Sequence, residues 1–347
     1  MRITLNTIQK ITAGTLGVML VLGLTVFGHA SSAEAAPVTG HQYVADVNHD
    51  GEGDAITFDG RTGDWWVAIY HGQSFQTPSR WISGFGIGSA NQFLADVTGG
   101  GKADLVTFDR TTGDWWVAPS TGTQFAPPAR WIAGHGVGST NQFLADVNGS
   151  GKADAVVFIG DGSWFVARSS GDNFGSPSNW FAKGHGVLST RQFVADVNGD
   201  DKADAVVWNA ATSDWYVAKS KEDHFDGTPN RWAAGLGIGS SDQFLTDVSG
   251  DGKVDAVFAF PLGSSRYGGQ WWVANGSHDD FKGANLWSTG FGNGVAKVMF
   301  KDVYHSNNAD MITFDGNTGD WYVYPAGDEA FINGGVSRWI SGFGLGT

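Results

Sequence analysis

The sequence predicts an all-β protein, a six-bladed β-propeller whose blades are four-stranded antiparallel sheets. A unit of about 50 residues occurs six times, each unit holds four short apolar runs, and turn residues separate the runs. The repeats are expected at about residues 42–91, 92–141, 142–191, 192–242, 243–297 and 298–347. An acidic nonapeptide marks each repeat and begins at Asp46, Asp96, Asp146, Asp196, Asp247 and Asp302.

The second repeat shows the order of its elements. It runs through "NQFLADV", an acidic loop, "ADLVTFD", a "TTGD" turn, "WWVAPS", a proline-containing loop and "RWIAGHGVGS". Short runs rich in Val, Phe, Trp and Ile between turn residues are typical of β-strands and too short for ordinary helices. Four strands per unit predict a propeller blade. A parallel β-helix is the alternative, but its coils are usually shorter than this unit.

The phase of the repeat predicts a closed ring. The final "SGFGLGT" matches residues 83–89, and the start of the first repeat matches the residues that follow them. The last repeat therefore stops where the first begins. We expect the two ends of the array to meet.

The N-terminal 35 residues are expected to be a signal peptide, which leaves residues 36–347 as a single propeller domain. Arg2 and Lys10 flank a polar start, an apolar run spans 11–27, and "AEA" at 33–35 offers a cleavage site. An uncleaved membrane anchor is the alternative. No membrane span is expected in the mature chain, which we expect to be secreted and extracellular, either free or associated with the cell surface.

Composition restricts the partners. The chain has 347 residues and a net charge of -14, and its 21 lysines and arginines form no basic cluster, which argues against nucleic acid. It has no cysteine, so an exported chain of this kind is held by packing, hydrogen bonds or metal ions.

The acidic nonapeptides are the candidate metal sites. Oxygen-bearing side chains stand at places one, three, five and nine, and the carbonyl at place seven lies between them, a pattern that suits the hard oxygen ligands of Ca²⁺. The first, fourth and fifth copies have the full set, and the third has most of it. The expected calcium ligands are Asp46, Asn48, Asp50, Glu52 and Asp54; Asp196, Asn198, Asp200, Lys202 and Asp204; Asp247, Ser249, Asp251, Lys253 and Asp255; and Asp146, Asn148 and Asp154, with place seven contributing its carbonyl.

Two copies depart from this pattern. The second has Gly100 at place five, and the sixth has Tyr304 and Ser306 at places three and five. For every copy, the alternative is an acidic turn that is held by side-chain to backbone hydrogen bonds without a metal.

At this point the sequence resembles a known family. "GFGIGSANQFLADV" and "DVNGDDKADAVVW" are similar to the FG-GAP or VCBS repeat, which occurs in integrin-type propellers, in secreted bacterial proteins and in a mushroom lectin specific for N-acetylglucosamine. The resemblance covers all six copies. It implies that the loop between the first two strands of a blade binds Ca²⁺. Many members have seven blades, whereas this chain has six repeats.

Two rows of tryptophan recur. The first is constant and is expected to pack between blades: Trp65, Trp115, Trp164, Trp215, Trp271 and Trp321. The second lies in the fourth strand of each repeat: Trp81, Trp131, Trp180, Trp232, Trp287 and Trp339. For this second row two interpretations stay open, packing and an exposed platform on which a sugar ring stacks.

An internal covariation joins the two rows. Four repeats have Asp before the first tryptophan and Arg before the second, and the third and fifth repeats lack both. We therefore expect four contacts across adjacent strands, Asp64–Arg80, Asp114–Arg130, Asp214–Arg231 and Asp320–Arg338. These pairs are either rim salt bridges or, together with Trp81, Trp131, Trp232 and Trp339, clusters that hydrogen-bond sugar hydroxyls.

The repetition favours binding over catalysis. Catalysis needs singular residues in one pocket, and no HExxH, GxSxG or phosphate-loop motif is present. Several weak equivalent sites give avidity for repetitive ligands. We therefore predict a calcium-stabilised, lectin-like propeller that binds glycans or cell-surface polysaccharide. The alternatives are a protein-binding adhesion module and, less favoured, a polysaccharide-degrading enzyme.

Overall fold

The structure is a computed structural model that describes residues 40–292, 295–327, 329–332 and 337–344. The chain divides into Met1–Glu34 and Ala35–Thr347, and every described residue belongs to the second unit. The expected signal peptide lies outside the described residues. Among the described residues, no helix has the length and apolar character needed to cross a membrane.

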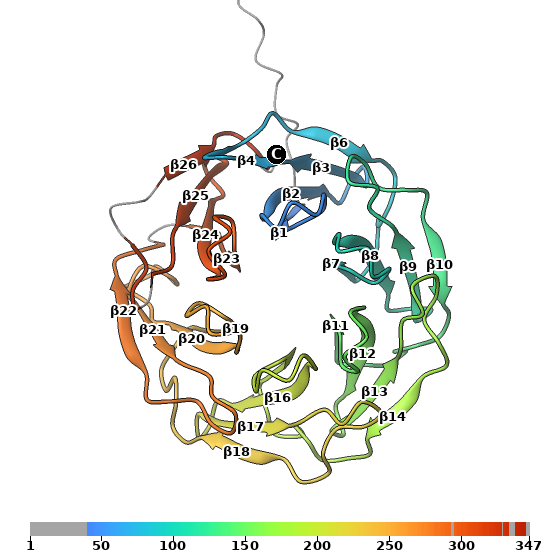
Figure 1. Ribbon diagram of the computed structural model, residues 1–347, viewed down its shortest axis with the longest axis vertical. Coiled ribbons are helices and arrows are strands. Elements are labelled where there is room, and N and C mark those ends of the chain that lie inside the picture. The colour runs from blue at the N-terminus through green and yellow to red at the C-terminus, as the bar shows by residue number, and fades with distance from the viewer. Residues whose placement is uncertain (1–39, 293–294, 328, 333–336, 345–347) are drawn as a thin grey trace, which may run out of the picture. The chain divides into compact units, whose positions relative to one another are not determined.

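The second unit is a ring of six four-stranded antiparallel sheets, which confirms the predicted fold (Figure 1). Blade 1 consists of β1 (Gly40–Ala45), β2 (Asp54–Asp59), β3 (Asp64–Ala68) and β6 (Ser79–Ile82), with a small hairpin of β4 (Tyr70–His71) and β5 (Ser74–Phe75). Blade 2 consists of β7 (Asn91–Ala95), β8 (Asp104–Asp109), β9 (Asp114–Ala118) and β10 (Ala129–Ile132). Blade 3 consists of β11 (Asn141–Ala145), β12 (Asp154–Ile159), β13 (Ser163–Ala167) and β14 (Ser178–Phe181).

The other three blades repeat this arrangement. Blade 4 consists of β15 (Arg191–Ala195), β16 (Asp204–Asn209), β17 (Asp214–Ala218) and β18 (Asn230–Ala233). Blade 5 consists of β19 (Asp242–Thr246), β20 (Asp255–Ala259), β21 (Gln270–Ala274) and β22 (Asn285–Thr289). Blade 6 consists of β23 (Lys297–Lys301), β24 (Asp310–Asp315), β25 (Asp320–Tyr324) and β26 (Ser337–Ile340). In each blade the first strand lies nearest the centre of the ring and the fourth lies outermost (Figure 1).

The constant tryptophan row is fully buried, as expected. All six side chains have no exposed surface. Each indole N–H donates to a backbone carbonyl in the connection that leads to the next blade, as Trp115 does to His135 O at 2.9 Å and Trp65 to Phe85 O at 3.0 Å. The row therefore fills the space between blades and fixes the connection between them at the same time.

The second tryptophan row is also buried, with exposed fractions between 2% and 8%, so the expectation of an exposed platform is wrong. The cause is a bulge in the fourth strand. Trp66 pairs with Arg80 and Trp65 pairs with Ile82, which leaves Trp81 as an extra residue without a partner in the register. Such an extra residue re-aims a side chain, and here it turns the indole into the space between blades.

Each bulged tryptophan packs against a phenylalanine of the following blade. Trp81 meets Phe125 edge-on with ring centroids 5.2 Å apart, and the same contact recurs at every junction. The other five pairs are Trp131–Phe174, Trp180–Phe225, Trp232–Phe281, Trp287–Phe331 and Trp339–Phe75. The last pair joins blade 6 to blade 1, so the ring closes through the same contact that links its neighbours.

Two of the connections between blades contain buried histidines. His185 is 4% exposed and its Nε2 lies 3.0 Å from Ala205 O. Burial lowers the pKa of His185 to about 4. The burial shows that this is a packing position, in agreement with the Phe that the first, fifth and sixth repeats have there.

Replacing His185 with Phe should therefore change the pH dependence of stability. The unfolded chain takes up a proton near pH 6.5 and the folded chain only near pH 4, so the native protein loses stability as the pH falls through this window. Relative to the native chain, H185F should gain about 2 kcal/mol of unfolding free energy between pH 7 and pH 5. Urea unfolding at both pH values measures this, and an equal effect of the substitution at the two pH values would contradict it.

Candidate functional site

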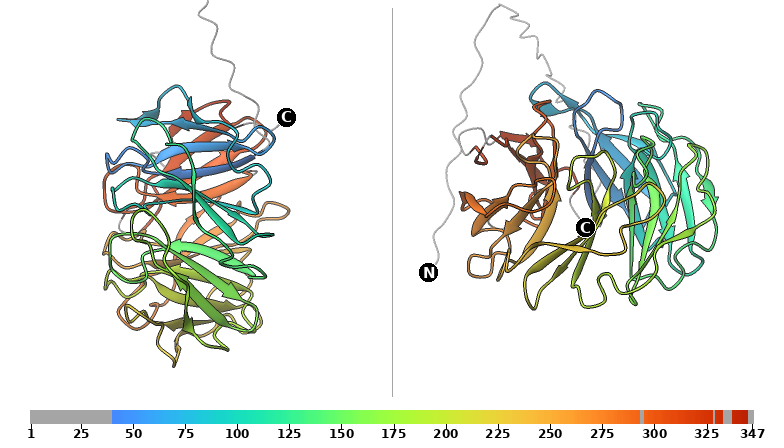
Figure 2. Two further views of the ribbon diagram at one scale, coloured as in Figure 1. Left: turned by 90° about the vertical axis from the view of Figure 1, so that its right-hand side faces the viewer. Right: turned by 60° about the horizontal axis from the view of Figure 1, so that its bottom comes forward.

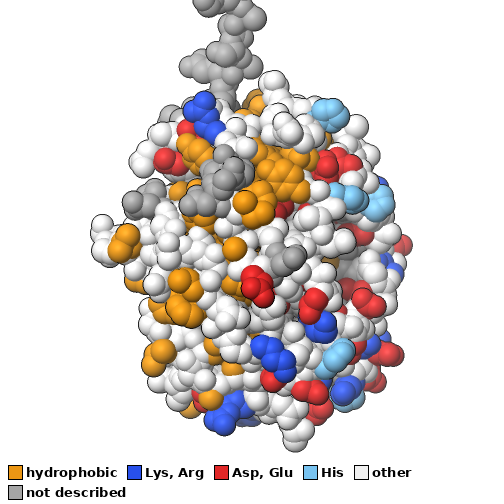
Figure 3. Space-filling model, turned by 60° about the vertical axis from the view of Figure 1, so that its left-hand side comes forward, with side chains coloured by type: hydrophobic (Ala, Val, Ile, Leu, Met, Phe, Trp, Pro, Cys, Tyr) orange, Lys and Arg blue, Asp and Glu red, His pale blue; other side chains and the backbone are white. Residues whose placement is uncertain are grey.

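The two ends of the blades differ in chemistry. The strands of a blade run between the two ends of the ring (Figure 2). One end carries the acidic loops and the loops between the third and fourth strands, and the other carries the "TGD" turns and the connections between blades. In a side view, acidic and histidine side chains gather toward one side and hydrophobic side chains toward the other (Figure 3).

Each acidic loop folds around the carboxylate at its first place. In the first loop, Asp46 Oδ1 accepts the N–H groups of Asn48 and His49 at 3.2 and 2.6 Å, and Oδ2 accepts that of Gly51 at 2.9 Å. The first-place carboxylate accepts loop N–H groups in the other five loops as well. Hydrogen bonds from the backbone thus account for the shape of the loop, as the metal-free interpretation expected.

The aspartate at the ninth place has a different role, because it caps backbone inside the blade. Asp54 is fully buried, and its two oxygens accept the N–H groups of Val47 at 3.1 Å and Tyr70 at 2.9 Å. Asp104, Asp154, Asp204, Asp255 and Asp310 are equally buried and bond in the same way to the loop that follows the third strand. Burial raises the pKa of Asp54 to about 7, although the two N–H groups favour its charged form.

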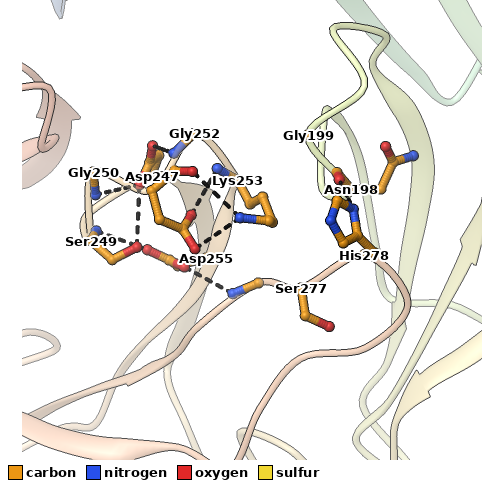
Figure 4. Close-up of polar contacts among 12 residues, drawn as sticks. Asn198, Gly199, Asp247, Ser249, Gly250, Gly252, Lys253, Asp255, Ser277 and His278 are labelled. Carbon is orange, nitrogen blue, oxygen red and sulfur yellow. Dashed lines mark hydrogen bonds and ion pairs between the residues drawn. The ribbon is translucent and has the colours of Figure 1, made fainter.

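The fifth loop shows how the remaining polar groups are used (Figure 4). Lys253 Nζ lies 3.0 Å from Asp251 Oδ2, so the cation at place seven neutralises the carboxylate at place five. The fourth loop has the same pair, Lys202 and Asp200, at 3.7 Å. The His278 ring, which belongs to blade 5, lies 2.9 Å from Asn198 O in the fourth loop and connects the two blades.

The residues present fit calcium in their chemistry more than in their arrangement. Places one, three and five of the first, fourth and fifth loops offer carboxylate, amide or hydroxyl oxygens, the ligand types that Ca²⁺ takes. Within the described ranges, no three Asp, Glu, His or Cys side chains are grouped to hold a metal ion, and the predicted calcium set also includes amide, hydroxyl and backbone carbonyl oxygens. Calcium in these loops stays a prediction. Four of the expected ligands, Asp54, Asp154, Asp204 and Asp255, are the ninth-place aspartates, and their hydrogen bonds give them a structural role.

A second candidate site lies at the opposite end of the blades, in the seam between blades 1 and 2. A cavity of about 290 Å³ opens there. Its lining residues are Phe85, Gly86, Ile87, Gly88, Ser89, Thr107, Asp109, Trp116 and Pro128. The first five belong to the connection that leaves blade 1, and the other four belong to blade 2.

Strand register explains why these side chains share one face of blade 2. Thr107 stands opposite Trp116 in β8 and β9, and Asp109 stands opposite Asp114. Arg130 in β10 also stands opposite Trp116. Residues that are paired or two apart in a sheet point to the same face, so a threonine, two aspartates, an arginine and an indole meet at this seam.

The predicted Asp–Arg contacts are confirmed in all four repeats. Arg130 Nη1 lies 3.0 Å from Asp114 Oδ2, and the other three pairs have separations between 3.4 and 3.9 Å. Asp64–Arg80, Asp214–Arg231 and Asp320–Arg338 are those pairs. The aromatic member of the cluster differs from the prediction, because the bulge turns Trp81, Trp131, Trp232 and Trp339 away from these pairs.

The aromatic residue that faces each Asp–Arg pair comes instead from the third strand. Trp116 is 37% exposed and lines the seam cavity, whereas its neighbour Trp115 is fully buried. The equivalent residues are Trp66, Phe165, Tyr216, Trp272 and Tyr322. Alternation along a strand could have identified this row, since two adjacent aromatic residues cannot both point into the same interface.

Comparisons with solved structures show the same fold. The chain is similar to a lectin of Agrocybe aegerita, described by its specific recognition of non-reducing terminal N-acetylglucosamine, with 23% identity over 88% of this chain and 81% of that one and a TM-score of 0.62. It is also similar to a chain of the Photorhabdus luminescens Tc holotoxin pore, with 17% identity over 80% of this chain and 13% of that one and a TM-score of 0.57.

These likenesses show a β-propeller that is structurally similar to a lectin, and they show the fold alone. No protein-family model matches the chain, and no curated protein matches it. The resemblance to the FG-GAP or VCBS repeat therefore stays a prediction.

Removing a ninth-place carboxylate should destabilise the fold strongly even without metal. Asp204 accepts the Ser220 N–H at 2.8 Å and the Asn198 side-chain amide at 3.1 Å, and alanine would leave both donors buried and unsatisfied. We expect D204A to lower the unfolding free energy by about 3 kcal/mol.

The matched control is D200A in the same loop, because Asp200 lies at the surface and should cost less than about 1 kcal/mol in metal-free buffer. Denaturant unfolding with a chelator present measures both variants. Equal losses would show that the ninth-place aspartate has no special structural role.

Proposed function

We propose that this protein is a secreted, lectin-like propeller that binds carbohydrate in the seams between its blades. The observation that carries the proposal is the half-exposed indole of Trp116 in a cavity beside a paired Asp and Arg. The likeness to a lectin named for N-acetylglucosamine supports the proposal and supplies the first ligand to test.

The side chains at the seam match what a sugar ring requires. One face of a pyranose is made of C–H groups and stacks on an aromatic ring, and the half-exposed Trp116 offers such a ring. Vicinal hydroxyl groups both donate and accept hydrogen bonds. Asp114 can accept from one hydroxyl while Arg130 donates to its neighbour, and the ion pair between them fixes their orientation.

A binding role is proposed in preference to catalysis because the Asp–Arg pair of the seam recurs in four blades. Hydrolysis of a glycoside needs one acid and one base or nucleophile with separate roles at one bond. In blade 2, Asp114 is paired with Arg130 at 3.0 Å, and the same pair recurs in blades 1, 4 and 6, so this carboxylate has no role that is singular to one blade.

Removing the indole should test the carbohydrate site directly. W116A should lower apparent affinity for a polymer bearing N-acetylglucosamine about ten-fold, because the stacking surface is lost while the surrounding strands stay paired. A glycan array and biolayer interferometry on the immobilised polymer measure the effect.

The control is L286A, which removes an exposed side chain from the outer strand of blade 5. It should leave polymer binding unchanged. Binding that is insensitive to W116A would contradict the seam as the sugar site.

A protein partner is the second candidate, favoured by exposed aliphatic side chains in the connections between blades. Ile87, Val137, Val187, Leu188 and Ile238 have exposed fractions between 49% and 81%. Side chains of this kind at one end of a ring suit an apolar protein surface. A glycan array without any hit, together with loss of cell binding in I238S, would favour this candidate over a lectin.

The proposal includes calcium in the first, fourth and fifth acidic loops. Donor chemistry supports it, and the first loop supports it most, because Glu52 there replaces the lysine that neutralises place five in the other two. Glu52 and Asp50 stand in the same loop with no lysine at place seven to offset them, and burial and the neighbouring Asp50 raise the pKa of Glu52. Bound calcium would supply positive charge among these oxygens.

Calcium should therefore raise thermal stability. At a concentration one hundred times the dissociation constant, one site contributes about 2.7 kcal/mol, which corresponds to a rise in Tm of a few degrees. D50A should reduce this rise and K102A in the second loop should not, because the second loop lacks an acidic side chain at place five. Thermal melting with calcium and with a chelator measures the difference, and identical curves would remove calcium from the proposal.

Export is the remaining part of the proposal. The polar start, the apolar run and the small residues before Ala36 support a cleaved signal peptide. Mass spectrometry of the protein recovered outside the cells should find a chain that begins near Ala36. A chain that retains the apolar run would favour the membrane anchor.

A further inference from the structure

The six blades do not present the same side chains at their seams. Blades 1, 2 and 6 share the pattern "TFD" and "TGDW" followed by a second aromatic residue. Each therefore carries a threonine, two aspartates, an aromatic residue and an arginine. The members are Thr57, Asp59, Asp64, Trp66 and Arg80 in blade 1; Thr107, Asp109, Asp114, Trp116 and Arg130 in blade 2; and Thr313, Asp315, Asp320, Tyr322 and Arg338 in blade 6.

Register places each set on one sheet face. In blade 1, Thr57 stands opposite Trp66, Asp59 opposite Asp64, and Trp66 opposite Arg80. Blades 2 and 6 show the same three pairings. The three sets are therefore structurally equivalent, and the threonine, which the sequence comparison of Asp and Arg did not include, belongs to them.

The other three blades lack this set. Blade 3 has aliphatic or uncharged residues at all five positions, Val157, Ile159, Ser163, Phe165 and Asn179. Blade 5 has Phe258, Phe260, Gln270, Trp272 and Leu286. Neither has a carboxylate or a guanidinium at these five positions.

Blade 4 is intermediate, because it keeps the Asp–Arg pair and replaces the threonine and the turn aspartate. Asp214 and Arg231 are 3.9 Å apart, the longest of the four separations, and Asp214 Oδ1 already accepts the Gly235 N–H at 3.1 Å. In blade 1, by contrast, Asp64 Oδ1 and Thr57 Oγ1 are buried and have no hydrogen-bond partner among the described residues. Buried polar atoms of this kind are normally satisfied by water or by a ligand.

Blades 6, 1 and 2 are consecutive around the ring, since blade 6 contacts blade 1 where the ring closes (Figure 1). We propose that these three blades form one contiguous glycan-binding arc and that blades 3 and 5 bind no sugar. This inference rests on the proposed function. It adds the number of sugar sites, three, and the part of the ring on which they lie. Three equivalent sites on one half of a rigid ring select glycans that present the same sugar repeatedly.

The charges of the arc indicate the kind of sugar. In blade 6, Asp315 and Asp320 accompany the single Arg338, whereas in blade 2 Arg110 follows Asp109 and adds a second arginine beside Arg130. A uronic or sialic acid would meet an excess of like charge at the blade 6 site, so its binding there would be disfavoured. The expected ligand is a polymer of neutral sugars.

The test exchanges residues between blades, which keeps every substitution compatible with the fold. D114S with R130N gives blade 2 the residues of blade 3, and should lower apparent affinity for an N-acetylglucosamine polymer about ten-fold. Equivalent changes in blades 1 and 6 should each have the same effect, and all three together should abolish binding. The matched control, Q270S with L286N in blade 5, should change nothing.

The reverse exchange tests sufficiency. V157T, I159D, S163D and N179R together give blade 3 the full set and should create a fourth site. Crystals soaked in N-acetylglucosamine count the occupied seams, which should be those faced by blades 6, 1 and 2 in the native chain. A uronic acid polymer should bind at least ten-fold more weakly than the neutral polymer.

The outcomes separate this inference from the function on which it rests. Sugar at the seams of blades 3 or 5, or a blade 5 control as damaging as the blade 2 exchange, would overturn the arc and leave the lectin function standing. Absence of sugar from every seam, with no binding to the polymer, would overturn both.

Discussion

The ring depends on one contact, the packing of a bulged tryptophan from each outer strand against a phenylalanine of the next blade. Six such pairs have ring centroids between 5.1 and 5.3 Å apart, including Trp339–Phe75, where the last blade meets the first. An edge-on aromatic pair contributes about 1 kcal/mol beyond the area it buries, and the buried area of the indole contributes more. Within the described part of the chain, each blade consists of consecutive strands, so the closure is made by this packing and by hydrogen bonds such as that from Gln42 Nε2 to Gly344 O.

Burial of both blade faces confines ligand binding to the ends of the strands and the mouths of the seams. Trp115 and Trp116 illustrate the constraint, since one is fully buried between blades and its neighbour reaches solvent at a seam. The acidic loops occupy the other end of the blades. Their carboxylates accept backbone N–H groups of their own loop, and the first-place carbonyl of Asp46 accepts the N–H of Ala103 in the next blade at 2.7 Å. These loops therefore link blades before any ion is considered.

The fold could be predicted from the sequence because six repeats, each with turn residues between four apolar runs, are typical of a propeller. The Asp–Arg pairs could be predicted because the two positions change together from repeat to repeat. The orientation of Trp81 and its equivalents could not, because a bulge adds a residue to the backbone register without changing the residue types. The role of the ninth-place aspartate was missed although a signal existed. Asp104 and Asp310 persist in the two copies that lack the calcium donors, which a purely metal-binding role would not require.

Six copies of one blade allow structural and ligand-binding positions to be separated within a single chain. A residue that maintains the blade is needed six times, as Trp65 and Asp54 and their equivalents are. A residue that contacts a ligand is needed only where the ligand reaches, so its copies are free to change. Under the proposal, Thr107, Asp114 and Arg130 belong to this second class, since their equivalents are Val157, Ser163 and Asn179 in a blade whose strands keep the same pairing. Because the strands keep their pairing with either set, pairing alone does not require three consecutive blades to keep all five polar and aromatic groups together, and the proposed shared ligand would account for it.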